Sequence, residues 1–246
     1  MNDKISIIIC TYNSGEITRR AIESVLNQNY NNFECIVVDG ASTDGTADII
    51  KSYSTNPKFR YISEPDSGIF NAMNKGWQMA DGDWIYYLGA DDELLPNGLS
   101  DLFLQAKDSN SYDIIYGNIM YRRADGTKVI HHHKDHKLLP MMMFACHQGM
   151  IMRRSLMKKL GGFDESIKIL GDKELVIRTY YLKDCRYKAT EACVAVFMGG
   201  GASSSYWKCF KEDFKIIKKL HPGLKYILYV LQHYPRMWFK TAIGKI

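Results

Sequence analysis

The stretch Trp84-Ile85-Tyr86-Tyr87-Leu88-Gly89-Ala90-Asp91-Asp92-Glu93 joins a short apolar run to a cluster of carboxylates. The run is bulky, rich in aromatic residues and bounded by turn-forming residues, so it predicts a buried strand. Adjacent carboxylates repel one another, and hard divalent cations prefer oxygen ligands, which makes Asp91 and Asp92 candidate metal ligands. The alternative interpretation is a solvated acidic turn.

The chain before this stretch alternates between two patterns. Apolar, β-branched runs predict strands over residues 5–11, 33–38 and 59–62, and helical spacing predicts helices over residues 17–28, 46–53 and 69–79. In the third helix, Ile69, Met73 and Trp77 form a stripe that we expect to face the core. Strands that alternate with helices predict a parallel α/β sheet covered on both faces.

Acids follow three of the predicted strands: Asp39 after the second, Glu64 and Asp66 after the third, and Asp91 with Asp92 after the fourth. Ligands of such sheets bind at the carboxyl ends of the strands. We therefore expect one site there for a cation together with hydroxyl-rich or amide-bearing groups. The chain has no Gly-x-Gly-x-x-Gly after its first strand and no Gly-Lys-Ser/Thr loop, which argues against a dinucleotide-binding Rossmann domain and a P-loop protein.

The pattern changes after residue 107. Residues 114–121 and 128–132, with Asp125-Gly126 between them, predict a β-hairpin and therefore a mixed sheet. The histidines of this region favour an exposed basic arm, and a metal site built from His131 and His133 is the alternative. A helix is then predicted from residue 170 to about residue 183. Asp172 lies three and four residues before two apolar positions of that helix, so it either projects inward or serves as the N-cap.

Composition restricts the possible classes of protein. The 246 residues are 46% hydrophobic and 24% charged with a net charge of +5, which predicts a globular chain and gives no nucleic-acid signal. The six cysteines form no Cys-x-x-Cys pair, so neither a zinc ribbon nor a redox motif is expected. The sequence shows no signal-peptide pattern and no membrane-spanning run, so we expect a cytoplasmic protein.

We expect one α/β domain over residues 1–220 and a helical tail over residues 221–246. The tail mixes aromatic and aliphatic residues with lysine and arginine and contains no acid. That composition is typical of a helix lying at a membrane interface, and it predicts peripheral membrane contact. A C-terminal helix packed on the domain is the alternative.

In order along the chain, these motifs resemble those of the inverting family-2 glycosyltransferases with the GT-A fold. The matching pieces are Ser6-Ile7-Ile8-Ile9-Cys10-Thr11-Tyr12-Asn13, Val37-Val38-Asp39-Gly40-Ala41-Ser42-Thr43-Asp44-Gly45-Thr46, Glu64-Pro65-Asp66-Ser67-Gly68-Ile69-Phe70-Asn71-Ala72-Met73-Asn74-Lys75-Gly76, Gly89-Ala90-Asp91-Asp92, Gly162-Phe163-Asp164 and Gly171-Asp172. Each piece alone is weak, and the ordered set is specific. The third piece, with His147-Gln148, most resembles bacterial O-antigen, capsule and exopolysaccharide transferases.

The resemblance implies a fold and a set of roles. It implies a Rossmann-like mixed, mostly parallel sheet with helices on both faces and a C-terminal helical extension. A nucleotide-sugar donor would contact Thr11, Tyr12, Asn13, Asp39, Asp66, Asn74 and Asp91. Asp92 would bind Mn²⁺ or Mg²⁺, which neutralises the diphosphate as it departs.

The same resemblance makes Asp172 the general base. Many family members have Glu where this chain has Gly171, so Glu174 and Asp164 are alternatives for that role. His147, Gln148 and Arg178 would contact the acceptor or the donor.

The expected activity is metal-dependent, inverting transfer of a sugar from a nucleotide-diphosphate sugar to a hydroxyl of a glycan acceptor on a polyprenyl-diphosphate lipid. Uracil is the default base because it is common in the family. A nucleotidyltransferase and a nucleotide-binding scaffold without catalysis are the alternatives. The intact acids argue against the scaffold, and Gly171 is the only feature in its favour.

Overall fold

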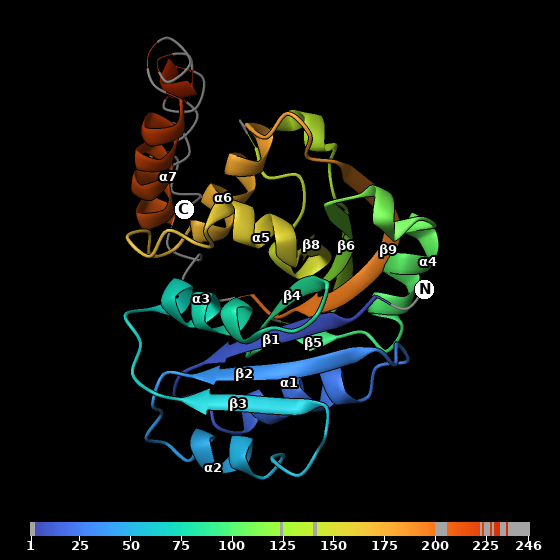
Figure 1. The fold of residues 1–246 in the computed structure, drawn as a ribbon. Coiled ribbons are helices and arrows are strands. Elements are labelled where there is room, and N and C mark those ends of the chain that lie inside the picture. The colour runs from blue at the N-terminus through green and yellow to red at the C-terminus, as the bar shows by residue number, and fades with distance from the viewer. Residues whose placement is uncertain are drawn as a thin grey trace.

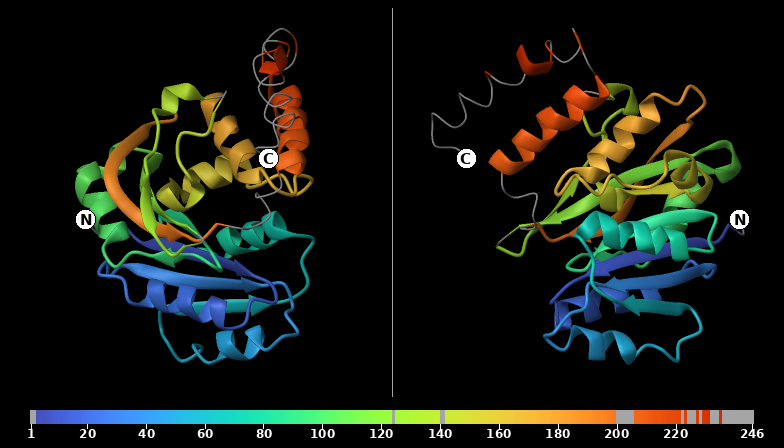
Figure 2. Two further views of the ribbon diagram at one scale, coloured as in Figure 1. Left: turned by 180° about the vertical axis from the view of Figure 1, so that it is seen from behind. Right: turned by 60° about the vertical axis from the view of Figure 1, so that its left-hand side comes forward.

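The computed structural model contains one mixed sheet of nine strands in the order β3-β2-β1-β4-β8-β6-β9-β5, with β7 paired to β6 (Figure 1). The structure describes residues 3–123, 125–139, 142–199, 206–221, 223, 227, 229–231 and 235. Helices lie on both faces of the sheet, as Figure 2 shows from two further directions. The sequence prediction of a mixed α/β sheet covered on both sides is confirmed.

The first half of the sheet is parallel. Its strands are β1 (Ile5–Thr11), β2 (Phe33–Asp39), β3 (Phe59–Ser63) and β4 (Trp84–Gly89). β1 is central because it pairs with both β2 and β4, and every residue of β1 and β2 is buried. The pairs Thr11–Asp39 and Cys10–Gly89 align the carboxyl ends of these strands, so the loops that follow open at one edge.

The second half mixes strand directions. Its strands are β5 (Glu93–Leu94), β6 (Ile114–Arg122), β7 (Lys128–His131), β8 (Met150–Arg153) and β9 (Tyr187–Phe197). β8 runs antiparallel to both β4 and β6, whereas β6 and β9 are parallel with two irregularities in register. The expected hairpin is present, because β6 and β7 pair antiparallel from Ile119–His131 to Arg122–Lys128.

Two helical layers enclose the sheet, each over its own hydrophobic core. One face carries α1 (Glu16–Leu26), α2 (Thr46–Lys51) and α4 (Gly98–Ala106). The other carries α3 (Ile69–Met79), α5 (Arg154–Leu160) and α6 (Gly171–Tyr180), with α7 (Tyr206–Leu220) contributing its own residues to the same core. Short 3₁₀ turns occur at Ser109–Ser111, His136–Leu138 and His147–Gly149.

The core stripe predicted on α3 is confirmed in part. Met73 and Trp77 pack against the core, whereas Ile69 is 42% exposed, and the fully buried positions are Phe70, Ala72, Asn74 and Gly76. The reason is a close approach to β1, because a Cβ at residue 76 would overlap the side chain of Ile8. Only a glycine permits this contact, and it fixes which face of α3 meets the sheet.

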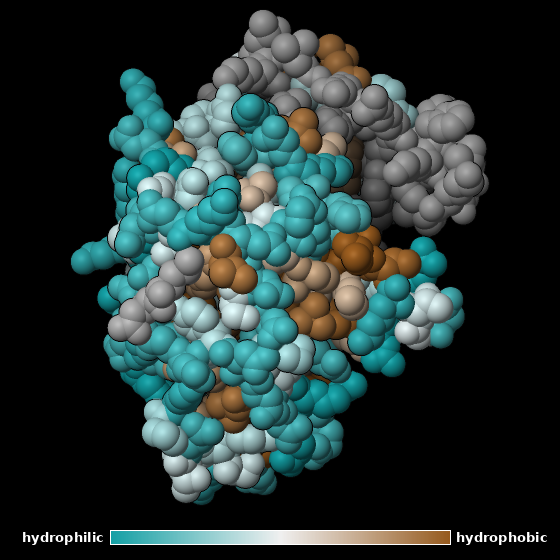
Figure 3. Space-filling view, turned by 90° about the vertical axis from the view of Figure 1, so that its right-hand side faces the viewer, coloured by the Kyte–Doolittle hydropathy of each residue, from teal (hydrophilic) through white to brown (hydrophobic). Residues whose placement is uncertain are grey.

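In the view of Figure 3, hydrophobic residues gather in one larger group at the centre right and in smaller groups elsewhere among hydrophilic residues. Within the part of the chain that the structure describes, no helix is long and apolar enough to cross a membrane. The predicted tail, residues 221–246, lies almost entirely outside the described residues. The domain boundary near residue 220 and the membrane contact of the tail therefore stay predictions.

Candidate active site

A cleft of about 540 Å³ opens beside the carboxyl ends of β1 and β4 and is walled by residues of α1, α3 and α6. It lies at the edge that the sequence identifies. Half of the predicted site residues line it, and these are Asn13, Asp91, Asp92, His147, Gln148 and Asp172. Asn13 and Asp172, which lie far apart in the sequence, are thus brought to one cavity.

Asp92 is the most constrained acid of the cleft. Its side chain is almost completely buried, and it accepts hydrogen bonds from Gln148 Nε2 at 2.8 Å and from the backbone N–H of Met198 at 3.0 Å. Burial in this apolar surrounding raises the pKa of Asp92 to about 6, and the neighbouring Asp91 adds to the rise. An ionised carboxylate at this position therefore gains from a nearby positive charge.

The two adjacent acids converge over Gly89. A Cβ on Gly89 would lie 2.5 Å from Asp92 Oδ2 and 3.0 Å from Asp91 Oδ1, so both carboxylates lean over the same glycine. Among the ion pairs of the described residues, none involves Asp91 or Asp92.

These oxygens fit a hard divalent cation. The described residues include no group of three or more His, Cys, Asp or Glu side chains that could hold a metal alone. Mg²⁺ in particular is commonly held by one or two carboxylates and completes its coordination with water and substrate phosphates. The acid pair suits that arrangement and does not suit a closed structural metal site.

Asp172 lies in the first turn of α6 and lines the same cleft. Leu170 is the N-cap of α6, so the alternative in which Asp172 is the N-cap is wrong and the inward orientation is confirmed. Asp172 accepts a hydrogen bond from the backbone N–H of Lys173 at 2.8 Å. A small cavity of about 20 Å³, lined mainly by apolar side chains such as Tyr87 and Val176, lies behind it.

Gly171 is closed off by an aromatic ring. A Cβ at this position would lie 2.7 Å from Cζ of Phe70 and 2.8 Å from two further ring atoms. Phe70 cannot easily yield, because it is buried and stacked on Phe163 with ring centroids 5.4 Å apart. The space that a larger residue would need at position 171 is filled by Phe70, which accounts structurally for the glycine.

His147 and Gln148 reach the cleft from a 3₁₀ turn before β8. The ring of His147 packs 5.3 Å from that of Tyr87 and 6.3 Å from that of Phe163. Burial lowers the pKa of His147, while the charge of Asp172 opposes the shift. Gln148 is the side chain that holds Asp92, a contact that the sequence does not reveal.

The loops after β1, β2 and β3 meet at Gly40, outside the cleft proper. A Cβ on Gly40 would lie 2.7 Å from Asp66 Oδ2 and 3.2 Å from Cδ2 of Tyr12, so these two side chains border one small area. The ring of Tyr12 is 63% exposed there. This edge offers an aromatic face and a carboxylate side by side.

Asp39 and Thr11 organise these loops from within. Asp39 is fully buried and accepts from the backbone N–H and hydroxyl of Ser42 and from the Ser63 hydroxyl at 2.6 Å. The hydroxyl of Thr11 is bonded to that of Thr18 at 2.8 Å. Both residues lie at the expected edge, and their polar atoms are bonded to the protein itself, so they shape the edge and do not form its surface.

Asn74 does not reach the cleft. Its amide donates to Phe163 O at 3.0 Å and Glu165 Oε1 at 2.8 Å, and its oxygen accepts from Phe163 N at 2.9 Å and Trp77 Nε1 at 3.1 Å. These bonds tie α3 to the loop before α6. The geometry gives Asn74 a structural role in place of the predicted donor contact.

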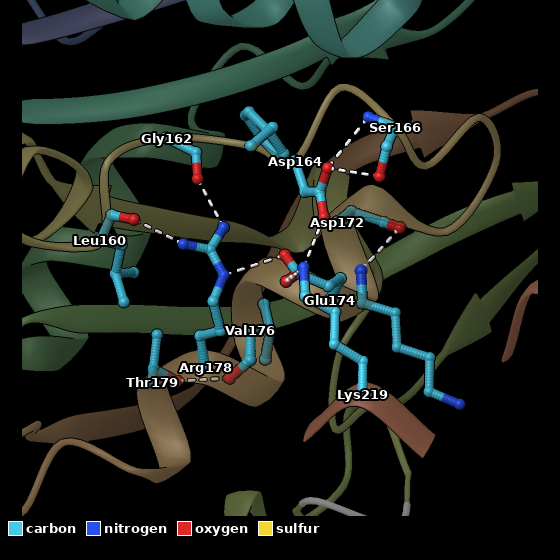
Figure 4. A network of polar contacts seen from close by, with 12 residues as sticks. Leu160, Gly162, Asp164, Ser166, Asp172, Glu174, Val176, Arg178, Thr179 and Lys219 are labelled. Carbon is cyan, nitrogen blue, oxygen red and sulfur yellow. Dashed lines mark hydrogen bonds and ion pairs between the residues drawn. The ribbon is translucent and has the colours of Figure 1, made fainter. Parts of the chain in front are cut away.

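The side chain of Arg178 likewise bonds to groups in the interior of the protein (Figure 4). Its guanidinium bonds to the buried Glu174 at 2.9 Å and to the carbonyl oxygens of Leu160 and Gly162. The predicted contact with donor or acceptor is therefore not supported. The two alternative bases fail for the same reason, because Glu174 faces Arg178, and Asp164 bonds to Ser166 and to Lys219 at 2.6 Å.

Of the histidines of the hairpin region, His131 and His132 are exposed, whereas the rings of His133 and His136 pack on Tyr116 and Tyr187. His136 stacks on Tyr187 with ring centroids 4.7 Å apart, and the backbone of His133 donates to Asn118 at 3.0 Å. No metal-ligand group is found among the described residues, so the alternative of a histidine metal site gains no support.

Two contributors to the cleft have no signal in the sequence. The backbone N–H of Met198 holds Asp92 from 106 residues away, and any residue except proline could supply it. Lys168 lines the cleft while donating to Glu165 O at 2.9 Å. A lysine in an irregular loop carries no periodicity or motif that would mark it in advance.

The mixed sheet, with its acidic cleft at the strand ends, defines an α/β enzyme of the GT-A type. The family model described as glycosyl transferase family 2 matches residues 6–161. The chain belongs to this family and is a glycosyltransferase. Membership of this family argues against both alternatives, the nucleotidyltransferase and the nucleotide-binding scaffold without catalysis.

Similar proteins extend the match along the chain. A "PGL/p-HBAD biosynthesis glycosyltransferase" of Mycobacterium bovis is 27% identical over 243 residues, which is 97% of this chain and 93% of that protein. The poly(ribitol-phosphate) beta-N-acetylglucosaminyltransferase TarP of Staphylococcus aureus is 34% identical over 118 residues, which is 46% of this chain and 36% of that protein.

Solved structures share the fold. Staphylococcus aureus TarS 1-349 in complex with UDP-GlcNAc matches with a TM-score of 0.69 and 21% identity, over 88% of this chain and 65% of that one. The mannosyltransferase PcManGT of Pyrobaculum calidifontis, in complex with GDP-Man and Mn²⁺, matches with a TM-score of 0.66 and 18% identity, over 89% of this chain and 64% of that one. At these identities the likeness confirms the GT-A fold alone.

Proposed function

We propose that the protein is a metal-dependent, inverting glycosyltransferase that moves a sugar from a nucleotide-diphosphate sugar to a hydroxyl of a glycan or lipid-linked acceptor. The observation that carries the proposal is that the acid pair over Gly89 and the carboxylate of Asp172 line one cleft. The acid pair suits a cation that is bound to a diphosphate, and Asp172 suits a general base that faces the acceptor.

The nucleotide is assigned to the edge around Gly40. The exposed ring of Tyr12 offers a stacking face, the adjacent Asp66 offers an acceptor for a base or ribose donor, and Asn13 continues this edge into the cleft. Asp39 keeps the loops in place through its bonds to Ser42 and Ser63. UDP-GlcNAc and GDP-Man in the two similar structures support a nucleotide-sugar donor and leave two bases to test.

Asp92, with Asp91 beside it, would hold Mn²⁺ or Mg²⁺. The ion would supply positive charge to the diphosphate leaving group. Gln148 and the Met198 amide keep the Asp92 carboxylate oriented toward the cleft. Lys168 lines the same cavity and adds positive charge to it.

Asp172 is proposed as the general base. It would accept the proton of the acceptor hydroxyl as that oxygen bonds to the anomeric carbon, and the nucleoside diphosphate would leave from the opposite face with inversion. The small cavity behind Asp172 is lined mainly by apolar side chains, and Asp172 itself lines the cleft. Phe70 excludes a second acid at position 171, so one carboxylate carries the role.

The acceptor class is drawn from two sources. The mycobacterial relative is named for PGL/p-HBAD biosynthesis, and TarP is named as a poly(ribitol-phosphate) beta-N-acetylglucosaminyltransferase. Apolar Ile69, Ile169 and Leu170 line the cleft near Asp172 and would suit an acceptor with an apolar portion. We therefore propose a role in bacterial surface glycan synthesis, with a polyprenyl-diphosphate-linked acceptor as the first candidate.

Calorimetric titration tests the donor site. The protein is titrated with UDP and with GDP, each in the presence of Mn²⁺ and of EDTA. We expect one nucleotide to bind in a metal-dependent manner and Asp92→Asn to abolish that dependence. Absence of binding for both nucleotides in every condition would overturn the donor-site assignment.

The base is tested separately. Asp172→Asn should retain metal-dependent nucleotide binding and lose sugar transfer by about a hundredfold or more, since general-base catalysis typically contributes roughly 10²–10⁴-fold. Asp184→Asn, at an exposed position beyond the C-terminal end of α6, is the matched control and should keep full activity. Transfer by Asp172→Asn at the rate of the unchanged protein would remove this residue as the base.

A further inference from the structure

The β6–β7 hairpin carries an excess of unneutralised positive charge. Residues 122–137 contain five lysines and arginines and two aspartates. Both aspartates are engaged locally, because Asp125 accepts from Thr127 and Asp135 accepts from the backbone of Lys137 and pairs with His136 at 3.5 Å. The hairpin and the segment that follows it to Lys137 are called the basic hairpin below.

Two cations face each other across the basic hairpin. Arg122 and Lys128 are directly paired in the antiparallel register, so their side chains project from the same face. Like charges in this position destabilise a strand pair. Every Asp and Glu of the chain lies among the described residues, and none of their ion pairs involves Arg122 or Lys128. An external anion would relieve the repulsion that the fold leaves in place.

An exposed apolar side chain lies on the same face as this pair. Ile130 alternates with Lys128 along β7 and pairs with Met120 of β6, so these side chains share the face. Ile130 is 52% exposed, and Leu138 and Met142 in the following segment are 45% and 39% exposed. Cations around an exposed isoleucine suit a binding partner that has an anionic surface and an apolar layer beneath that surface.

The basic hairpin also adjoins the cleft. Tyr121, one residue before the charged pair, packs on Phe197 with ring centroids 5.9 Å apart, and Phe197 lines the cleft together with Asp91 and Asp92. Tyr121 and Arg122 are consecutive in β6 and project from opposite faces, so the cleft adjoins the hairpin on the face opposite to Arg122 and Lys128.

We propose that the basic hairpin docks the protein on an anionic lipid bilayer. Arg122 and Lys128 meet lipid phosphates, and Ile130 enters the boundary between headgroups and acyl chains. A nucleic acid would satisfy the two cations and would leave Ile130 without an apolar partner, so the bilayer is the better match. The docking does not depend on the sugar-transfer chemistry; only its purpose, presenting the cleft to a lipid-borne acceptor, rests on the proposed function.

Vesicle sedimentation with the full chain tests the docking. Vesicles of phosphatidylglycerol and phosphatidylcholine in equal parts are compared with phosphatidylcholine alone, at low and at high salt. Each basic residue near an anionic surface contributes about fivefold in affinity. Arg122→Glu/Lys128→Glu should thus lower the affinity for anionic vesicles at least about tenfold, and Ile130→Glu should lower it at both salt concentrations.

Matched controls are available on other faces. Lys51→Glu/Lys107→Glu makes the same change of net charge at two exposed lysines, and Leu104→Glu changes an apolar residue that is 69% exposed on α4. Both should bind vesicles like the unchanged protein. Metal-dependent nucleotide binding should be the same in all variants, which shows that they fold and separates this proposal from the proposed reaction.

Three results would overturn the proposal. One is that the unchanged protein shows no preference for anionic vesicles. Another is equal vesicle binding by the unchanged protein and the hairpin variants, which would assign membrane binding to another segment such as the basic tail. The third is that a single-stranded oligonucleotide displaces the protein from vesicles and binds Ile130→Glu as well as the unchanged protein.

Discussion

The side-chain amide of Gln148 donates a hydrogen bond of 2.8 Å to Oδ2 of Asp92 and thereby fixes the carboxylate that we assign to the metal. The two residues come from different elements, the turn before β8 and the loop after β4. The contact orients Asp92 without adding charge. Groups that orient a metal ligand typically contribute about 10- to 100-fold to metal affinity or activity.

Replacement of Gln148 should therefore weaken metal binding while leaving the fold intact. We expect Gln148→Leu to lower the Mn²⁺-dependent affinity for the nucleotide about tenfold, measured by calorimetry, because Asp92 loses its orienting donor. Gln78→Leu, an exposed position on α3, is the control and should bind normally. Unchanged metal affinity in Gln148→Leu would show that the Met198 amide alone suffices to orient Asp92.

Position 171 should not accept a side chain while Phe70 is present. Gly171→Ala places a methyl group 2.7 Å from the ring, and forced overpacking of this kind costs about 1–3 kcal/mol. For a chain of this size each kcal/mol lowers the Tm by roughly 2–4 °C. Calorimetric unfolding should show this loss for Gly171→Ala and a larger one for Gly171→Glu.

A double-mutant cycle distinguishes the ring from other causes. Phe70→Ala alone creates a cavity and is destabilising, and the addition of Gly171→Ala to it should cost less than Gly171→Ala costs alone. Strictly additive losses would show that Phe70 does not determine the size of residue 171.

Arg178 should prove to be a stability residue. Its removal leaves Glu174 buried at 1% exposure with only Lys219, at 3.6 Å, as a cation nearby (Figure 4). Loss of one partner of a buried pair typically costs about 3–5 kcal/mol. We expect Arg178→Ala to lower the free energy of urea-induced unfolding by several kcal/mol.

The matched control for Arg178 is an exposed pair. Arg20 lies 3.9 Å from Glu93 with half of its side chain exposed, so Arg20→Ala should change stability by at most about 1 kcal/mol. A folded, stable Arg178→Ala whose nucleotide affinity falls would contradict the structural role and would restore Arg178 as a ligand.

The sequence predicts the location of the site, at the carboxyl ends of the strands, better than it predicts the role of each residue there. The end of β4 and its acids follow from a short apolar run and from chemistry that is local to it, so the sequence predicts that Asp91 and Asp92 lie at the cleft, while their roles stay predictions. Asn74 and Arg178 belong to the same polar residue types as true ligands. Asn74 donates to Phe163 O, 89 residues away, and Arg178 donates to Gly162 O, 16 residues away. No local sequence pattern indicates these contacts.

The helix α3 shows the same limit in packing. Spacing predicts a core stripe through Ile69, Met73 and Trp77 and misses Phe70, which is buried while Ile69 is exposed. The close contact of Gly76 with Ile8 turns Phe70 inward, where its ring lies against Gly171. A contact with β1 thus determines which residue can stand before Asp172, and no inspection of the motif around Asp172 would reveal it.

His147 should make stability depend on pH in the range where histidine titrates. Burial lowers the pKa of His147 in the folded protein, with Asp172 opposing the shift, whereas the unfolded chain has the ordinary value of about 6.5. As the pH falls below about 6.5 the unfolded state takes up a proton that the folded state does not, so the free energy of unfolding falls. Above that pH the contribution of His147 to stability is fully present.

Urea titrations of the unchanged protein and of His147→Gln between pH 8 and pH 5 should show a steeper loss of stability in the unchanged protein. All other groups are common to both proteins, so their contributions cancel in the difference. Parallel curves would mean that His147 keeps its ordinary pKa in the fold, for example because the charge of Asp172 fully compensates its burial.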